Sequence, residues 1–133
     1  MNISIEVFFN NLVESEILTF NNPPANFVNN GGLLYFDDDA EHFFMANLDN
    51  FIMAKIVNPA KIKMNDVFSA NIKYALPDEE VELLLSSSPF YRDLLMAEDN
   101  AAPSVLILKE EDTVVRIINS NYLRSIVVSE KKQ

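Results

Sequence analysis

Hydrophobic and polar residues alternate in short runs along the first third of the chain. Ile3, Ile5 and Val7 alternate with Ser4 and Glu6, which predicts a half-buried β-strand. Similar short apolar runs predict further strands over residues 16–20, 33–36, 43–46 and 51–57. Polar stretches rich in asparagine, proline and glycine separate these runs and are typical of turns, as at residues 21–26 and 29–32.

The run over residues 51–57 is apolar on both sides apart from Lys55. A strand with no polar face is typical of a position buried on both sides or inside a barrel. Asn58 and Pro59 follow directly, and proline cannot donate to a sheet ladder. We therefore expect an inner strand that ends at this dipeptide.

The C-terminal half is rich in β-branched residues. We expect strands over residues 67–74, 105–108, 113–118 and 123–128. The loops between the last three are short and polar, which predicts a β-meander. Residues 90–97 fit a second helix or an edge strand equally well.

One segment has the pattern of a short helix. Pro77 suits a first helical turn, and the carboxylates of residues 78–80 suit the positive end of the helix dipole. Val81, Leu84 and Leu85 have the spacing of one helix face. Together the patterns predict an all-β protein, a small antiparallel β-barrel-like fold with one short helix, over residues 1–133 as a single domain. With two glycines and 16 asparagines, we expect asparagine to form many of the turns.

Charge limits the classes of partner. The chain has 20 acidic and 10 basic residues, a formal net charge of −10 and a pI of about 4.4. Nucleic acids and anionic membranes attract basic surfaces, so we expect neither as a direct partner and expect a protein with a basic face instead. The chain has no cysteine, no signal-peptide pattern and no apolar run long enough to cross a membrane, from which we expect a soluble, cytoplasmic protein.

Side chains for catalysis are scarce. His42 is the single histidine, and its acidic neighbours indicate a surface position in a polar turn rather than a catalytic triad. The run over residues 37–41 resembles the start of a calcium loop, but that loop needs glycine where His42 stands and glutamate where Leu48 stands. The two glycines are adjacent, so no phosphate-binding loop is expected either. The sequence thus predicts no enzyme, no cofactor, no metal and no catalytic residue.

Several short motifs, in order, resemble the flagellar assembly factor FliW family. They include Ile-Leu-Thr-Phe at 17–20, the apolar strand that ends in Asn58-Pro59, and Leu-Pro-Asp-Glu-Glu at 76–80. Phe-Phe-Met-Ala-Asn-Leu at 43–48, Ala-Pro-Ser-Val at 102–105 and the segment 114–122 are also similar to family segments. The chain departs from the family pattern at residues 22–27, 60–75 and 98–101.

The resemblance implies a regulator and not an enzyme. FliW proteins are small cytoplasmic β-barrel-like proteins that bind flagellin and also bind CsrA, an RNA-binding translational repressor. Binding relieves repression of flagellin synthesis. The resemblance therefore implies flagellin and CsrA as protein partners and a role in flagellum biogenesis.

The acidic segments are candidate partner contacts, where carboxylates would form a charged rim around an apolar centre. The residues concerned are Asp78, Glu79, Glu80, Glu82, Glu110 and Glu111. An ordinary solvated helix start and hairpin loop explains them equally well. Asn58 and Pro59 match a family motif, although strand termination alone also explains them.

Two other functions fit the residues. An acidic immunity protein or nucleic-acid mimic would use the same charge to block a basic toxin or a DNA-binding enzyme. An enzyme built on carboxylates would need two of them to converge in a buried pocket.

Overall fold

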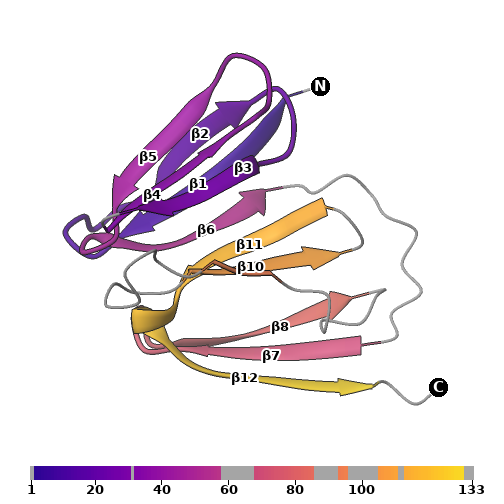
Figure 1. Cartoon of the computed structure of the whole chain (residues 1–133). Helices are drawn as coiled ribbons and strands as arrows, with labels where there is room; N and C mark the ends of the chain where they lie inside the picture. The colour runs from indigo at the N-terminus through magenta and orange to yellow at the C-terminus, as the bar shows by residue number, and fades with distance from the viewer. Residues whose placement is uncertain are drawn as a thin grey trace.

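The computed structural model describes residues 2–30, 32–57, 68–85, 93–95, 105–110 and 113–130. In these residues the chain forms twelve antiparallel strands and one short 3-10 turn (Figure 1). The strands are β1 Ile3–Phe9, β2 Glu16–Phe20, β3 Ala25–Asn30, β4 Leu33–Asp37, β5 Phe43–Asn47, β6 Phe51–Val57, β7 Phe68–Tyr74, β8 Glu79–Leu85, β9 Asp93–Leu95, β10 Val105–Glu110, β11 Thr113–Asn119 and β12 Leu123–Glu130. The all-β prediction is confirmed.

Three sheets form three layers (Figure 1). The central sheet has the order β2-β1-β6-β11-β10-β9, and the two outer sheets have the orders β3-β4-β5 and β12-β7-β8. Among the described strands the sheets are not closed on themselves, so the barrel-like arrangement expected from the sequence is wrong. A layered stack forms instead because the central strands have apolar side chains on both sides and need a cover on each.

The central sheet separates two hydrophobic cores. Along β10 and β11 successive residues point to opposite faces, so that Ile107 and Ile117 join the core under β3–β5 while Leu108 and Ile118 join the core over β7 and β8. In β6 the four residues from Phe51 to Ala54 are all buried. The prediction of a strand buried on both faces is therefore confirmed for residues 51–54, while residues 55–57 are only partly buried.

Arg116 of β11 bonds the central sheet to the β12-β7-β8 layer. This buried guanidinium donates through Nη1 to the Tyr74 hydroxyl, at 2.9 Å, and lies 3.7 Å from the sulfur of Met53. Burial raises the pKa of Tyr74, and the positive charge of Arg116 opposes part of that rise. On the same face of the central sheet, Lys55 forms an ion pair with Glu6 at 3.2 Å.

The segment predicted as a helix is a strand, and that prediction is wrong. Residues 75–78 form a turn, and β8 then pairs antiparallel with β7 along its whole length. The same residues that have helical spacing also alternate, because Val81 and Leu83 are apolar while Glu80 and Glu82 are polar. Val81 and Leu83 pack on the second core, so tertiary pairing with β7 decides between two compatible patterns.

Two other expectations also need correction. The strand β3 includes residues 25, 26, 29 and 30, which were expected to lie in turns. Its asparagines fit a strand because Asn29 is buried within it, and because Asn26 adopts a left-handed conformation, with φ of 53°, at a bulge. The predicted β-meander is wrong, because β10 and β11 form a hairpin but β12 pairs with β7 in a different sheet. The ambiguous segment 90–97 contains β9, an edge strand beside β10.

Asn119 directs the chain from the central sheet to the outer one. Its buried amide Nδ2 donates to the carbonyl oxygens of Leu48 and Phe51, at 2.8 and 2.9 Å, and its Oδ1 accepts from the backbone N–H of Asn121. The 3-10 turn Ser120–Tyr122 begins directly after it. One side chain therefore ends the hairpin and holds the β5–β6 turn against it.

We predict that Asn119→Ala lowers the free energy of unfolding by about 2 to 4 kcal/mol, because two buried carbonyls lose their donor. The control is Asn121→Ala, whose exposed side chain should cost at most about 0.5 kcal/mol. Urea unfolding of both variants measures the difference. Equal stability of the two variants would contradict this role for Asn119.

Candidate functional site

The outer side of the β3-β4-β5 sheet presents apolar side chains to solvent. Val28 pairs with Tyr35, which pairs with Met45 on its other side, and residues in register on neighbouring strands point to the same face. Leu33 and Phe43 lie on that face as well, by the alternation of β4 and β5. We call these five residues the outer apolar face.

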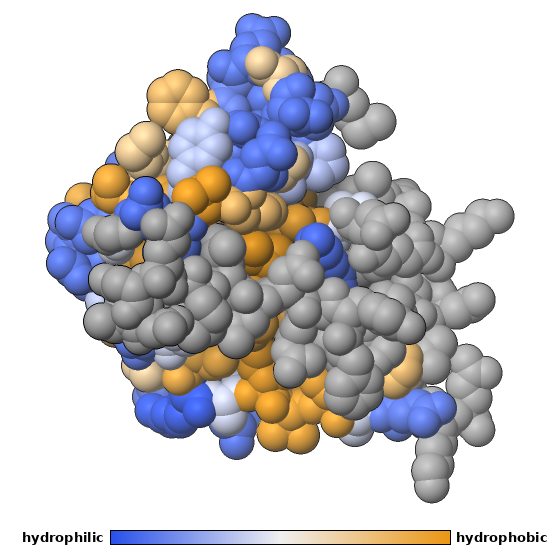
Figure 2. Space-filling model, viewed as in Figure 1, coloured by the Kyte–Doolittle hydropathy of each residue, from blue (hydrophilic) through white to orange (hydrophobic). Residues whose placement is uncertain are grey.

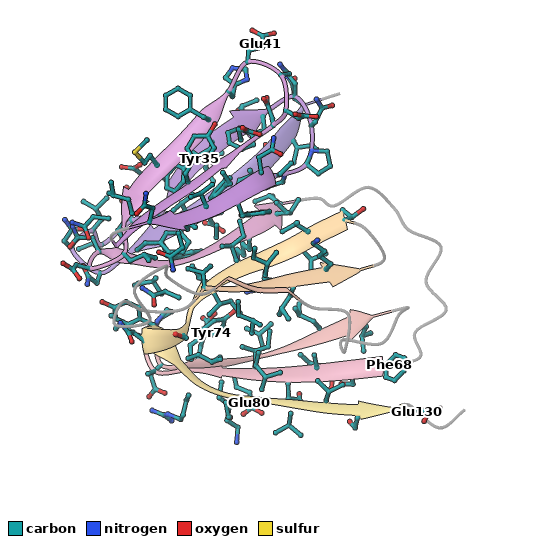
Figure 3. All side chains as sticks on the ribbon, viewed as in Figure 1. Tyr35, Glu41, Phe68, Tyr74, Glu80 and Glu130 are labelled. Atoms are coloured by element: carbon teal, nitrogen blue, oxygen red, sulfur yellow. The ribbon has the colours of Figure 1, made fainter. Side chains whose placement is uncertain are left out.

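The outer apolar face is accessible. Phe43 is 65% exposed and Met45 is 53% exposed, while Leu34 and Phe36 of the same strands are fully buried in the first core. Figure 3 shows Tyr35 on this uppermost sheet. Exposed apolar side chains that cluster on one sheet are typical of a surface that binds another protein.

Aromatic and acidic groups meet at one end of the outer apolar face. The rings of Tyr35 and Phe43 stack, with centroids 5.9 Å apart. The Tyr35 hydroxyl donates to Oδ2 of Asp37 at 2.8 Å; this bond raises the pKa of Tyr35 and lowers the pKa of Asp37. An open pocket of about 280 Å3 lies here, lined by Tyr35, Asp37, Asp39, Ala40, Glu41, His42 and Phe43.

The turn between β4 and β5 is built on Asp38, which is buried although its neighbours Asp39, Ala40 and Glu41 are exposed, as expected for a polar turn. The side chain of Asp38 has no exposed surface. Its Oδ1 accepts from the backbone N–H groups of Ala40, Glu41 and His42, and its Oδ2 accepts from the N–H of Asn21. Burial by itself raises the pKa of this carboxyl, but the hydrogen bonds outweigh it and hold the pKa well below its usual range.

His42 belongs to the same turn. Its Nδ1 lies 3.1 Å from Oδ2 of Asp38, and its ring stacks on Phe20. Its side chain is half exposed, as the sequence predicts for a surface histidine. These contacts give it a structural role in holding Asp38.

Charge is divided unevenly between the two halves of the chain. Residues 1–54 contain eight acidic residues and no lysine or arginine, so that all ten basic residues lie from Lys55 onward. The remaining 12 acidic residues nearly balance them. Asp37, Asp39 and Glu41 beside the outer apolar face consequently have no lysine or arginine in their part of the chain to neutralise them. Hydrophilic side chains surround exposed apolar ones at this end of the molecule (Figure 2).

The structure brings together four of the residues predicted to contact a partner. Asp78 lies in the β7–β8 turn, and Glu79, Glu80 and Glu82 follow it along β8, all of them exposed. Asp78 lies 3.7 Å from Arg124, and Glu80 pairs in register with Lys73. They belong to the layer opposite the outer apolar face, as the positions of Glu80 and Tyr35 in Figure 3 show. They therefore do not form a rim around it.

The other predicted contacts are less defined. Glu110 is the last residue of β10, and Asn58, Pro59 and Glu111 lie outside the described residues. Within the described ranges no group of three His, Asp or Glu side chains could hold a metal ion. No helix in those ranges is long and apolar enough to cross a membrane.

The outer apolar face is not apparent from the sequence. Leu33 and Leu34 are identical in type, and so are Phe43 and Phe44, so the sequence alone does not tell which one of each pair is buried. The available signal was the register between the two strands, since pairing Tyr35 with Met45 places both on the side opposite Phe36 and Phe44. That register requires knowledge of the turn built by Asp38.

We predict that Asp38→Ala lowers the melting temperature by several degrees at neutral pH, because the turn loses its hydrogen-bond acceptor. The folded pKa of Asp38 lies below the ordinary value of 3.8, so its contribution to stability is full above about pH 4 and is lost as pH falls from there. The difference from the wild type should accordingly shrink in acid. Thermal melts from pH 7 to pH 2 measure this, with Asp49→Ala at an exposed position as the control. A difference in melting temperature between wild type and Asp38→Ala that did not depend on pH would disprove the prediction.

Comparisons with known proteins identify no relative of this chain. No protein-family model matches the chain, and searches of curated proteins and of solved structures give no match.

Proposed function

We propose that this is a non-catalytic binding protein that holds a basic partner protein on its outer apolar face. The observation that carries the proposal is the exposure of Phe43 and Met45 beside Tyr35 on a sheet whose opposite side packs on the first core. A desolvated aromatic and aliphatic centre is the usual source of affinity between proteins.

The magnitudes favour the apolar face over the acidic strand as the source of affinity. Burying one large apolar side chain contributes about 1.5 to 3 kcal/mol, whereas an exposed ion pair contributes about 0 to 1 kcal/mol. Phe43, Met45 and Leu33 together therefore outweigh the exposed carboxylates of β8. The carboxylates of both surfaces act mainly on the rate and orientation of encounter with a basic partner.

The family resemblance supplies candidate partners and a setting. We propose flagellin and CsrA as the proteins bound, with relief of repression of flagellin synthesis in the cytoplasm as the outcome. What supports this is the order of the short FliW-like motifs and the net charge of −10, which suits an RNA-binding repressor with basic regions. In this proposal Asp78, Glu79 and Glu80 contribute steering charge, together with Glu82, Glu110 and Glu111.

We predict that the protein binds purified flagellin or purified CsrA at low ionic strength, and that Phe43→Ser weakens the complex by about tenfold or more because the centre of the interface loses its ring. Raising the salt concentration should weaken binding of the wild type as well, since the opposite charges are screened. Isothermal titration calorimetry measures both effects.

The matched control is Val127→Ser on β12, which is 58% exposed on a different sheet and should bind like the wild type. If neither flagellin nor CsrA binds at low salt, the flagellar function is wrong. If a basic nuclease or toxin is captured through Phe43 instead, the binding face stands and the acidic immunity function replaces the flagellar one.

A further inference from the structure

We propose that the partner contributes an extended, basic segment that adds as a new strand to the open edge of β5. This inference rests on the proposed binding function and specifies how the partner docks. The proposed contact is made by the backbone edge of β5 and by a groove along that edge. The outer apolar face, by contrast, consists of side chains on the solvent side of the sheet.

The backbone of β5 has a partner strand on one of its two sides. Among the strands that the structure describes, β5 pairs with β4 alone. Two backbone hydrogen bonds close the ends of the β4–β5 ladder. The N–H of Asp38 donates to the carbonyl of His42 at 3.0 Å, and the N–H of Leu48 donates to the carbonyl of Gly32 at 2.8 Å. Because hydrogen-bonded pairs alternate along an antiparallel ladder, Phe44 and Ala46 also turn their N–H and C=O groups toward β4. The N–H and C=O groups of Phe43 and Met45 then point to the open edge, which is a template for an added strand.

A groove lies directly along this edge. It has a volume of about 320 Å3 and runs between β5 and the segment that joins β1 to β2. Phe44 and Ala46 line its β5 side, and Phe9, Leu12 and Glu16 line the other. A strand that paired with Phe43 and Met45 would direct every second side chain into this groove and the remaining ones outward beside Phe43 and Met45. Apolar residues would suit the inward positions, and basic residues would suit the outward ones, on the same side as Asp37 at the β4–β5 turn.

Charge identifies the occupant as a different, basic chain and not a second copy. An edge-to-edge pair of two β5 strands would bring together two segments of residues 1–54, each with eight acidic residues and no lysine or arginine. Like charges in contact oppose such a pair, whereas outward lysine or arginine on a foreign strand would lie near the carboxylates at the β4–β5 turn.

The probe is a short peptide in which valine alternates with lysine and arginine, compared with an isomer of equal composition whose valines are adjacent. We expect the alternating peptide to bind the wild type at least about tenfold more tightly than the isomer, in NMR titrations. Two N-methylated forms of the alternating peptide, each methylated at every second amide, give a test that leaves the protein unchanged. One form should lose binding and the other should keep it, because the amides facing β5 are needed and the opposite ones are not.

Variants of Met45 test the same edge from the protein side. Met45→Pro removes a donor at the open edge, where proline is tolerated in edge strands, and should weaken peptide binding by about tenfold. Met45→Ala shortens the same side chain but keeps the N–H, and should therefore bind the peptide more tightly than Met45→Pro. Circular dichroism establishes that both variants are folded.

Three results would overturn strand addition. These are equal binding of both peptide isomers with no effect of N-methylation, absence of binding by either peptide, or a dimer of the free protein that Met45→Pro dissociates. If strand addition fails in any of these ways while a partner still binds through Phe43, the proposed function survives without it. If no partner binds through Phe43, the proposed function fails independently.

Discussion

Burial of β6 on both faces is the constraint on which the rest of the structure depends. Phe51 and Ala54 point into one core, and Ile52 and Met53 point into the other. A strand with no polar face needs an apolar cover on each side, and the outer sheets β3-β4-β5 and β12-β7-β8 provide the two covers. Each outer sheet then has its inner side packed and its outer side available to solvent.

The two outer sheets use that exposed side differently. On β7 and β8 the outward positions include Lys73, Glu80 and Glu82, a mixed polar surface that needs no partner. On β4 and β5 the outward positions include Tyr35, Phe43 and Met45, which a monomer in water gains nothing by exposing. The absence of lysine and arginine from residues 1–54 gives the same sheet a charge of one sign. Apolar centre, negative surroundings and an open β5 edge thus coincide in one layer.

The strands could be predicted from the sequence where one physical signal dominated. Residues 51–57 contain apolar side chains at nearly every position, and β-branched residues dominate 113–118, so both strands were predicted. Where two signals compete the prediction failed. In 79–85 a helical spacing and a two-residue alternation coexist, and pairing with β7 decided for the strand. The path of β12 depended on Asn119, whose amide bonds carbonyls some 70 residues away in sequence, a contact that no local pattern encodes.

The candidate site was less predictable than the fold because it depends on register. The acidic run predicted a partner contact in the turn before β8 and along β8. The carboxylates there are exposed but have Lys73 and Arg124 as basic neighbours. The outer apolar face arises only when Asp38 fixes the β4–β5 turn, so that Phe43 faces outward and Phe44 inward. A one-residue shift of that turn would reverse the two phenylalanines and remove the face.

Hydrogen exchange of the protein, free and saturated with its captured partner, tests most directly where binding takes place. We expect amide exchange to slow in β4 and β5, with Met45 among the residues most affected, and to stay unchanged in β8 and β12. Slower exchange confined to the turn at Asp78 and to β8 would place the interface on the acidic strand and contradict binding through the β3-β4-β5 sheet.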